Sequence, residues 1–172
     1  MLTRQIGLLC GHHDQAASYF RQAVDLGRQP GDHNGEADGL GGLAEADLHQ
    51  GRYEQARGRL ENARTIYQDT GNPVRDTNAT YFLGVLELRQ GHHEDAASLL
   101  QHARTAFHDR GDRTNEAYGL CRLAELGSCL RRHQQAIDQL QQALDLCRQA
   151  GDGIGQVHAL NGLARVHAAL SS

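Results

Sequence analysis

The segment GRYEQARGRLENARTIYQDTGN, from Gly51 to Asn72, recurs along the chain at a fixed distance. Forty residues later the chain reads GHHEDAASLLQHARTAFHDRGD, and after another forty it reads RRHQQAIDQLQQALDLCRQAGD. An earlier copy, GHHDQAASYFRQAVDLGRQPGD, begins forty residues before the first segment. Self-similarity at a fixed period is the signature of a repeat protein, in which each repeat buries its apolar face against its neighbours. The repeat therefore decides the architecture.

Within each copy, apolar residues follow the spacing of three and four residues that is typical of an amphipathic helix. One helix of each pair carries two small residues with a large one between them, and its partner helix carries a large residue beside a small one. Small residues let two helices approach closely, and large ones fill the gaps beside them. The first set is Ala16, Phe20, Ala23, Ala56, Leu60, Ala63, Ala96, Leu100, Ala103, Ala136, Leu140 and Ala143, and the second is Leu43, Ala44, Leu83, Gly84, Leu123, Ala124, Leu163 and Ala164.

Glycine followed by Asp or Asn marks the end of one helix and the start of the next, as at Gly31-Asp32 and Gly71-Asn72. Glycine is common just after a helix, and Asp or Asn caps the next N-terminus, with Asp32 or Asn34 available at the first of these turns. Pro73 occupies the first helical position, where proline is favoured. We expect a short N-terminal helix before a turn at Gly11, and eight more helices at about 14–29, 34–50, 53–70, 74–90, 93–110, 114–130, 133–150 and 154–170, which makes nine.

The period divides the chain into one array with regular boundaries. Residues 1–10 align with the second half of a helix, so we expect the chain to be cut from a longer array. We expect a single array over residues 1–172, with a partial first repeat at 1–32, full repeats at 33–72, 73–112 and 113–152, and a terminal capping helix at 153–172.

The pattern formed by Leu40, Leu43, Ala44, Gly51, Tyr53, Ala56, Leu60 and Ala63 resembles the tetratricopeptide repeat (TPR). The forty-residue period is similar to the longer TPR variants of bacterial regulators and of eukaryotic scaffold adaptors. The resemblance covers residues 11–170 and implies an all-α solenoid of antiparallel helix pairs in a right-handed superhelix. The chain departs from the usual pattern where a large aromatic residue is replaced by Asp47, Glu87, Gly127 and His167.

Composition excludes several classes of function. All 17 basic residues are arginine, the net charge is −4 and no basic stripe is present, so direct nucleic-acid binding is not expected. No apolar stretch approaches the length of a membrane span, and residues 1–11 lack the apolar segment of a signal peptide. The four cysteines show no disulfide spacing, which favours a reduced, cytoplasmic protein without a membrane partner.

The residues that would suggest chemistry do not converge. His12-His13, His92-His93 and His133 occupy the same turn of different repeats, forty residues apart, whereas zinc requires three or four ligands around one point. The glycines of the Gly151–Gly155 string follow a helix, whereas a phosphate-binding loop follows a strand. Cys121, Cys129 and His133 lack an acidic orienting partner. We therefore expect no enzyme activity, no catalytic or metal-binding residues and no cofactor.

In TPR proteins, the first helix of each repeat lines a concave groove that binds peptides, and the resemblance implies the same here. Tyr81 and Tyr118 are expected to form an aromatic patch, because aromatic residues and arginine tend to dominate binding energy. Asp38 and Glu45 favour a partner with basic character toward one end. The expected partner-binding residues are Asp38, Glu45, His49, Asn78, Tyr81, Arg89, Tyr118, Cys121, Glu125, His158, Asn161 and Arg165.

We therefore predict a non-enzymatic protein-interaction module that binds a peptide or protein segment. The sequence style is similar to sensor regions of large bacterial transcription activators, in which TPR repeats follow a DNA-binding domain and a nucleotide-hydrolysing switch. Two alternatives remain. One is a homo-oligomerisation module, for example a homodimer, that uses the stack ends; the other is a small-ligand sensor. The apolar residues expected at the stack ends are Leu2, Ile6, Leu8 and Leu9 on one side and Leu160, Leu163 and Val166 on the other.

Glycines within the helices set one further expectation. Gly39, Ala79, Gly119 and Ala159 share one position of the repeat, where close packing explains a small residue. No such reason is evident for Gly41-Gly42, and each glycine costs up to about 1 kcal/mol of helix propensity. We expect the helix at 34–50 to be the least stable of the inner helices.

Overall fold

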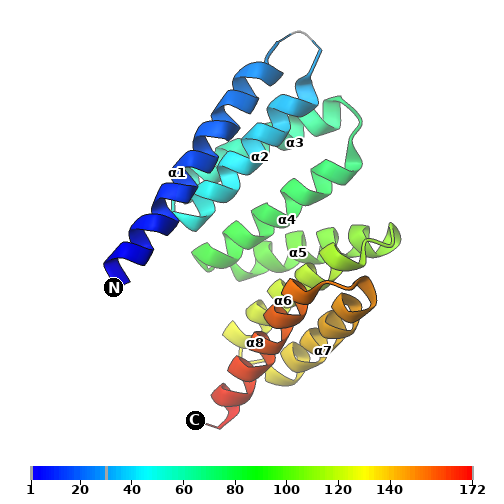
Figure 1. The fold of residues 1–172 in the computed structure, drawn as a ribbon. Helices are drawn as coiled ribbons and strands as arrows, with labels where there is room; N and C mark the ends of the chain where they lie inside the picture. Colours follow the sequence, from blue (N-terminus) through cyan, green and yellow to red (C-terminus); the bar gives the residue numbers. More distant parts are fainter. Residues whose placement is uncertain (1, 30, 172) are drawn as a thin grey trace. The chain divides into compact units, whose positions relative to one another are not determined.

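The structure, a computed structural model, describes the backbone of residues 2–29 and 31–171 and the side chains of residues 15–29 and 31–171. Within these ranges the chain forms eight α-helices and no strand (Figure 1). The helices are α1 (Leu2–Gly27), α2 (His33–His49), α3 (Tyr53–Asp69), α4 (Pro73–Gln90), α5 (His93–Asp109), α6 (Arg113–Cys129), α7 (His133–Ala150) and α8 (Gly153–Leu170).

Even-numbered helices, here called A helices, begin forty residues apart, and the B helices α3, α5 and α7 repeat with the same period. The local sequence explains these starts. Asp32, Asp112 and Asp152 each accept a hydrogen bond from the backbone N–H three residues later, at 3.0, 3.2 and 2.9 Å. Asn72 caps α4 in the same way at 3.3 Å, and Pro73 is the first residue of that helix, as predicted. Each cap satisfies a backbone donor that the first turn of a helix leaves free.

The N-terminal region differs from the prediction. Instead of a short helix, a turn at Gly11 and a second helix, α1 runs unbroken from Leu2 to Gly27, which gives eight helices rather than nine. A helix of about ten residues is marginal by itself, whereas each residue added to an existing helix gains one backbone hydrogen bond. Glycine inside a helix costs only about 1 kcal/mol, so Gly11 does not end α1.

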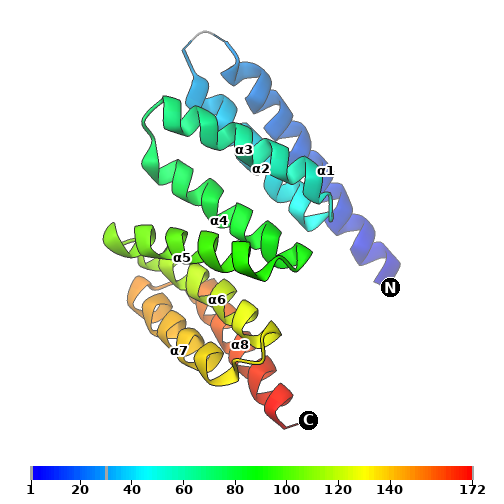
Figure 2. The same cartoon turned by 180° about the vertical axis from the view of Figure 1, so that it is seen from behind.

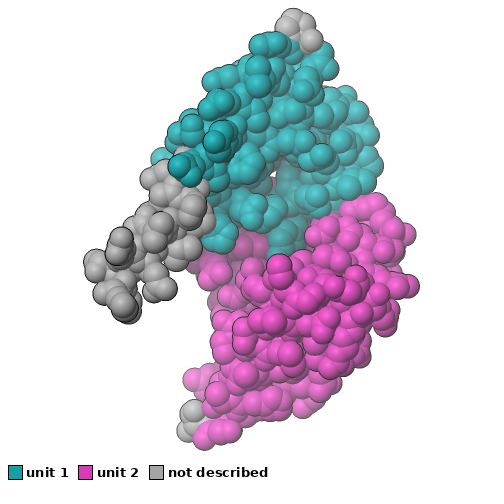
Figure 3. Space-filling model, in the orientation of Figure 1, with its two compact units in different colours: residues 1–82 teal, residues 83–172 magenta. Residues whose placement is uncertain are grey.

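Residues in the structure group into two compact units, residues 1–82 and residues 83–172 (Figure 3). Within unit 1, α1 packs against α2 and α2 packs against α3 (Figure 1). Within unit 2, α6 contacts α5, α7 and α8, and α7 also contacts α8, as the reverse view also shows (Figure 2). The repeat boundaries at residues 33, 73, 113 and 153 remain a prediction, although each coincides with the first residue of an A helix.

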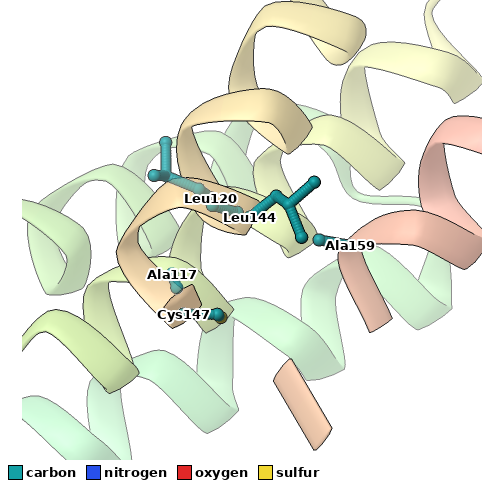
Figure 4. Close-up of a cluster of buried hydrophobic side chains, with 6 residues drawn as sticks. Ala117, Leu120, Leu144, Cys147 and Ala159 are labelled. Carbon is teal, nitrogen blue, oxygen red and sulfur yellow. The ribbon is translucent and has the colours of Figure 1, made fainter. Parts of the chain in front are cut away.

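The small and large positions of the repeat form the core in three of the four copies. Ala56, Ala63, Ala96, Ala103, Ala136 and Ala143 are fully buried, and the leucines between them are at most 3% exposed. In unit 2, side chains from three helices form one cluster (Figure 4), and its members are Ala117, Leu120, Ala143, Leu144, Cys147 and Ala159.

The first copy is offset by one residue. Ala17 and Val24 are buried there, whereas Ala16 and Ala23, predicted from the register, are half-buried. One residue corresponds to a rotation of about 100° around a helix. In the other copies a turn before the B helix sets the register, and α1 lacks that turn. The continuous helix therefore presents a slightly different face to α2.

Two acidic residues are buried where TPR sequences usually carry an aromatic residue. Asp47 is fully buried and binds the guanidinium groups of Arg52, at 2.5 Å, and of Arg59. Glu87 is 5% exposed, and its carboxylate lies 2.7 Å from Nδ1 of His92. A buried carboxylate is costly unless it is paired and hydrogen-bonded, so each acid depends on these partners.

Gly42 has a packing reason that the sequence did not reveal. A methyl group at this position would overlap the ring of Phe20 on α1. The same relation recurs where Leu140 packs on Gly162 of the following helix, and Leu100 makes a similar contact with Gly84 on the preceding helix. Gly41 differs, because nothing lies within 4 Å of an added Cβ there.

The pair Gly41 and Gly42 allows a matched stability test. Gly42→Ala is expected to destabilise the protein by about 1–3 kcal/mol, because Phe20 must move to make room. Gly41→Ala is expected to stabilise it by up to about 1 kcal/mol, because alanine favours the helix and the space is open. Urea unfolding followed by circular dichroism measures both values. Equal effects of the two substitutions would contradict the contact between Gly42 and Phe20.

Arg131 occupies a turn position that glycine fills in two other copies. Its φ is 58°, in the left-handed region, and the equivalent Gly51 and Gly91 have φ of 73° and 81°. A residue with a side chain is destabilised by about 1–2 kcal/mol in this backbone conformation. Glycine avoids this strain, but it loses more conformational entropy on folding, which offsets part of the gain.

Arg131→Gly is therefore expected to stabilise the chain by about 1 kcal/mol, measured as a higher urea midpoint. The reverse change at the equivalent turn, Gly91→Arg, is expected to destabilise it by a similar amount. A lower midpoint for Arg131→Gly would show that Arg131 contributes more through its side chain than its backbone costs.

Candidate functional site

The A helices carry most of the polar side chains that the sequence singled out. All twelve expected partner-binding residues lie on α2, α4, α6 or α8, and all are half-buried or exposed. Their side chains are therefore accessible to a partner. Each compact unit has a cavity between two successive A helices, and the two cavities are described separately.

The cavity of unit 1 has a volume of about 170 Å³ and lies between α2 and the start of α4. Leu60 and Tyr67 of α3 contribute to its wall. Gly41 lines it as well, and the missing side chain at this position leaves space open. Three expected residues, Asp38, Glu45 and Asn78, also line it, together with Gly42, Arg75, Ala79 and Phe82.

Asp38 is held in place by two neighbours. The Tyr67 hydroxyl donates a hydrogen bond to Asp38 Oδ1 at 2.8 Å, and Nη1 of Arg75 lies 2.5 Å from the same oxygen. Burial and the Asp38 carboxylate raise the pKa of Tyr67 above its usual range, which keeps the hydroxyl protonated as a donor. Glu45 is exposed and makes no ion pair among the described residues, so its carboxylate is available to a ligand.

The cavity of unit 2 has a volume of about 220 Å³ and lies between α6 and α8, with His133 and Leu140 of α7 in its wall. Four expected residues line it, namely Cys121, Glu125, His158 and Arg165. Five side chains that the sequence did not single out for binding complete the polar and apolar wall, namely Arg122, Ala124, Ser128, Val166 and Ala169; Cys129 and Gly162 lie there too.

Glu125 is neutralised by arginines, whereas Arg165 is free. The Glu125 carboxylate lies 2.9 Å from Arg122 and 3.8 Å from Arg89. Arg165 is exposed and has no acidic partner among the described side chains. The ring of His158 stands edge-on to that of Tyr118, with centroids 6.2 Å apart. A ligand in this cavity would therefore find an unpaired guanidinium beside an aromatic pair.

The two cavities occupy the same place in the repeat. Leu60 in unit 1 and Leu140 in unit 2 occupy the same position of the repeat, two periods apart. Each lines its cavity from a B helix, α3 or α7. Their charges differ. The cavity of unit 1 combines Asp38 and Glu45 with Arg75, whereas that of unit 2 combines Arg122 and Arg165 with Glu125. With neutral histidine, one is acidic and the other is basic.

Five of the expected residues line neither cavity, namely His49, Tyr81, Arg89, Tyr118 and Asn161. The ring of Tyr81 packs edge-on against Phe82, with centroids 5.2 Å apart. Tyr81 belongs to unit 1 and Tyr118 to unit 2, so their aromatic patch stays a prediction. Sequence reasoning missed Arg75, Arg122 and His133, because the direction in which a side chain points depends on the neighbouring helix. The match between Leu60 and Leu140, two forty-residue periods apart, was the available signal for the cavity walls.

Two thiols of unit 2, those of Cys121 and Cys147, are unsuited to nucleophilic chemistry. Burial raises the pKa of Cys121 to about 11, nearby Cys147 adds to the rise, and Arg122 opposes it. Burial also raises the pKa of Cys147, whose side chain is 1% exposed. Since the thiolate is the reactive form, both thiols are inert at neutral pH. Among the described residues, no group of three His, Cys, Asp or Glu side chains is placed to hold a metal ion.

Comparisons with known proteins agree with the helical repeat described above. Residues 35–109 match the family model of the tetratricopeptide repeat. No curated protein matches the chain significantly in sequence.

Two crystal structures resemble it along nearly its whole length. BtubC (BKLC) from P. vanneervenii has a TM-score of 0.67 at 17% identity, over 94% of this chain and 76% of its own. A candidate kinesin light chain of Podosopora anserina, with nearly identical TPR-like repeats, has a TM-score of 0.68 at 17% identity, over 95% and 81%.

The fold is thus an all-α, TPR-like solenoid, as predicted. The family match supports a tetratricopeptide-repeat family over residues 35–109, and the two structures share the fold. None of the helices in the described part of the chain is long and apolar enough to cross a membrane.

Thiol labelling tests the electrostatics of the unit 2 cavity. At pH 7.5, iodoacetamide is expected to alkylate exposed Cys129 rapidly and Cys121 about 100-fold more slowly, because so little of Cys121 is thiolate. Peptide mapping by mass spectrometry follows each site. In urea the two rates are expected to become equal, which serves as the control. Labelling of Cys121 at the rate of Cys129 in the folded protein would contradict the raised pKa.

Proposed function

We propose that this chain is a non-enzymatic protein-interaction module that binds a peptide or protein segment on the A-helix face. TPR proteins generally mediate protein–protein interaction, which supports the class. The observation that carries the proposal is the recurrence of a cavity at the same place of the repeat in both units. A cavity at the same place of each unit suits a peptide or protein ligand that inserts a side chain into each.

The charges of the cavities define the ligand further. In unit 1, the free carboxylate of Glu45 favours a cationic side chain, and in unit 2 the free guanidinium of Arg165 favours a carboxylate. The proposed partner therefore carries a basic group for one cavity and an acidic group for the other. Charge complementarity of this kind contributes specificity and association rate more than affinity.

The wider setting of the module is also part of the proposal. We place it in the sensor region of a larger bacterial regulator, where partner binding would be transmitted to other domains. This placement rests on the similarity of sequence style described above, which is analogy. A cytoplasmic location fits the three free cysteines among the described side chains.

Charge reversal in the cavities tests the proposed surface. Glu45→Arg and Arg165→Glu are each expected to weaken partner binding by about 1–2 kcal/mol, a loss of about five- to thirty-fold. Pull-down from native lysate identifies the partner, and titration of the purified partner then gives the affinity of each variant.

Matched control variants reverse the same charges on α3 and α1, away from the A helices. Glu61→Arg and Arg21→Glu lie at exposed positions that line neither cavity, so they are expected to leave binding unchanged. All four variants must keep the circular dichroism of the parent chain. Equal loss in cavity and control variants would place the binding surface elsewhere than in the cavities.

A further inference from the structure

The last A helix exposes an apolar stripe that lies outside both cavities. On α8, Val157 is 57% exposed and Leu160 is 50% exposed, and Ala164 beside them is exposed too. Spacings of three and four residues place the three side chains on one face of the helix. None of them lines the cavity of unit 2. Ile154, one turn earlier, is 72% exposed and extends the apolar surface.

The same positions are buried on α4 and α6, and on α2 two of the three are buried while Leu40 is half-buried. On α6 the equivalents Ala117, Leu120 and Ala124 are at most 2% exposed. On α2, Ala37 and Ala44 are fully buried, and on α4 Thr77 and Thr80 are at most 6% exposed. The other three A helices therefore keep most of this stripe covered, whereas α8 presents it to solvent, with Val157 in place of the alanine of α2 and α6.

The structure of unit 2 shows what covers the stripe on α6. Ala136 and Leu140 of α7 pack with Ala124. Ala143 and Cys147 of α7 pack with Ala117 and Leu120, in the cluster that Figure 4 draws. The covering helix thus presents a small residue, a leucine four positions later and a second small residue three positions after that. The same three-residue pattern is fully buried on α3, at Ala56, Leu60 and Ala63.

We infer that the stripe of Val157, Leu160 and Ala164 docks an amphipathic helix of another protein that carries this small–large–small pattern. The α6–α7 interface is the template, because its A-helix side is equivalent in position to the α8 stripe. Helix α8 has one arginine and no acidic residue, so acidic side chains flanking the pattern would complement it.

A second folded copy of the chain does not supply such a helix. The pattern residues of α3, α5 and α7 are at most 3% exposed, and on α1 Ala17 and Val24 are buried against α2. Presenting any of them to another copy would require the donor to unfold. A folded second copy is therefore not the inferred occupant, and the inferred partner helix has an apolar face that is free before binding.

A peptide with the sequence of α7 is a direct probe of this site. We would label the His133–Ala150 sequence with fluorescein, replace Cys147 by alanine and titrate it with the full 172-residue chain, measuring anisotropy. Saturable binding in the micromolar range is expected. Leu160→Glu in the protein is expected to weaken it by about tenfold or more, because it places a charge in the apolar contact.

Two controls isolate the stripe. Val74→Glu changes an aliphatic side chain that is 46% exposed on α4 and is expected to leave binding unchanged. A peptide with Leu140→Glu is expected to lose binding, because the large residue of the pattern is then charged. Circular dichroism of each protein variant excludes unfolding as the cause of any loss.

Three results would overturn the inference. One is the absence of peptide binding at millimolar protein. Another is binding that Leu160→Glu leaves intact, which would mean that the peptide replaces α7 on α6. The third is a dimer in light scattering that Leu160→Glu dissociates, which would make a second copy the occupant.

Discussion

The structure depends on one kind of steric contact, made between a large side chain on α1 or a B helix and a residue without a Cβ, or with only a methyl group, on a neighbouring A helix. Leu100 against Gly84, Leu140 against Gly162 and Phe20 against Gly42 are instances of it. A side chain at any of these glycines would separate the helices and open a void that apolar burial could not fill. The cavities lie beside this contact, since Leu60 and Leu140 belong both to the core and to a cavity wall. Packing and the proposed binding surface therefore share residues.

Buried charge is the second constraint. Asp47 and Glu87 occupy core positions, and each is held by a side chain from the turn that follows, Arg52 for the first and His92 for the second. An ion pair of this kind stabilises less than a well-packed apolar residue would, but removal of one partner leaves an uncompensated charge. The position of Asp47 and Glu87 is occupied by Gly127 in the next copy. The equivalent turn residue, Arg132, therefore lacks a carboxylate at this position. The copies thus share a backbone conformation and differ in the side chains at this position and in whether a buried carboxylate there needs a partner.

Much of the fold could be predicted because its determinants are local. Glycine, Asp and proline at the turns give the helix starts, and the spacing of alanine and leucine gives the buried face. The prediction was wrong where tertiary context decides the outcome. Gly11 matches the turn glycines in sequence, yet α1 continues through it. Gly42 has a neighbour, Phe20, that lies on another helix and is remote in sequence. The register predicted Asp38, Glu45 and Arg165 as binding residues. It did not predict that Arg75, Arg122 and His133 also line the cavities, because side-chain direction depends on neighbouring helices.

The caps at Asp32, Asn72, Asp112 and Asp152 have a consequence for how such a chain evolves. Each one restarts the helical phase at the same point of the period, so errors of register do not accumulate from copy to copy. A duplication or loss of forty residues in phase would leave every remaining cap, turn and steric contact with its proper neighbour. Unequal recombination between copies could therefore lengthen or shorten the array without a new folding problem, and the charge of an added cavity could then diverge separately.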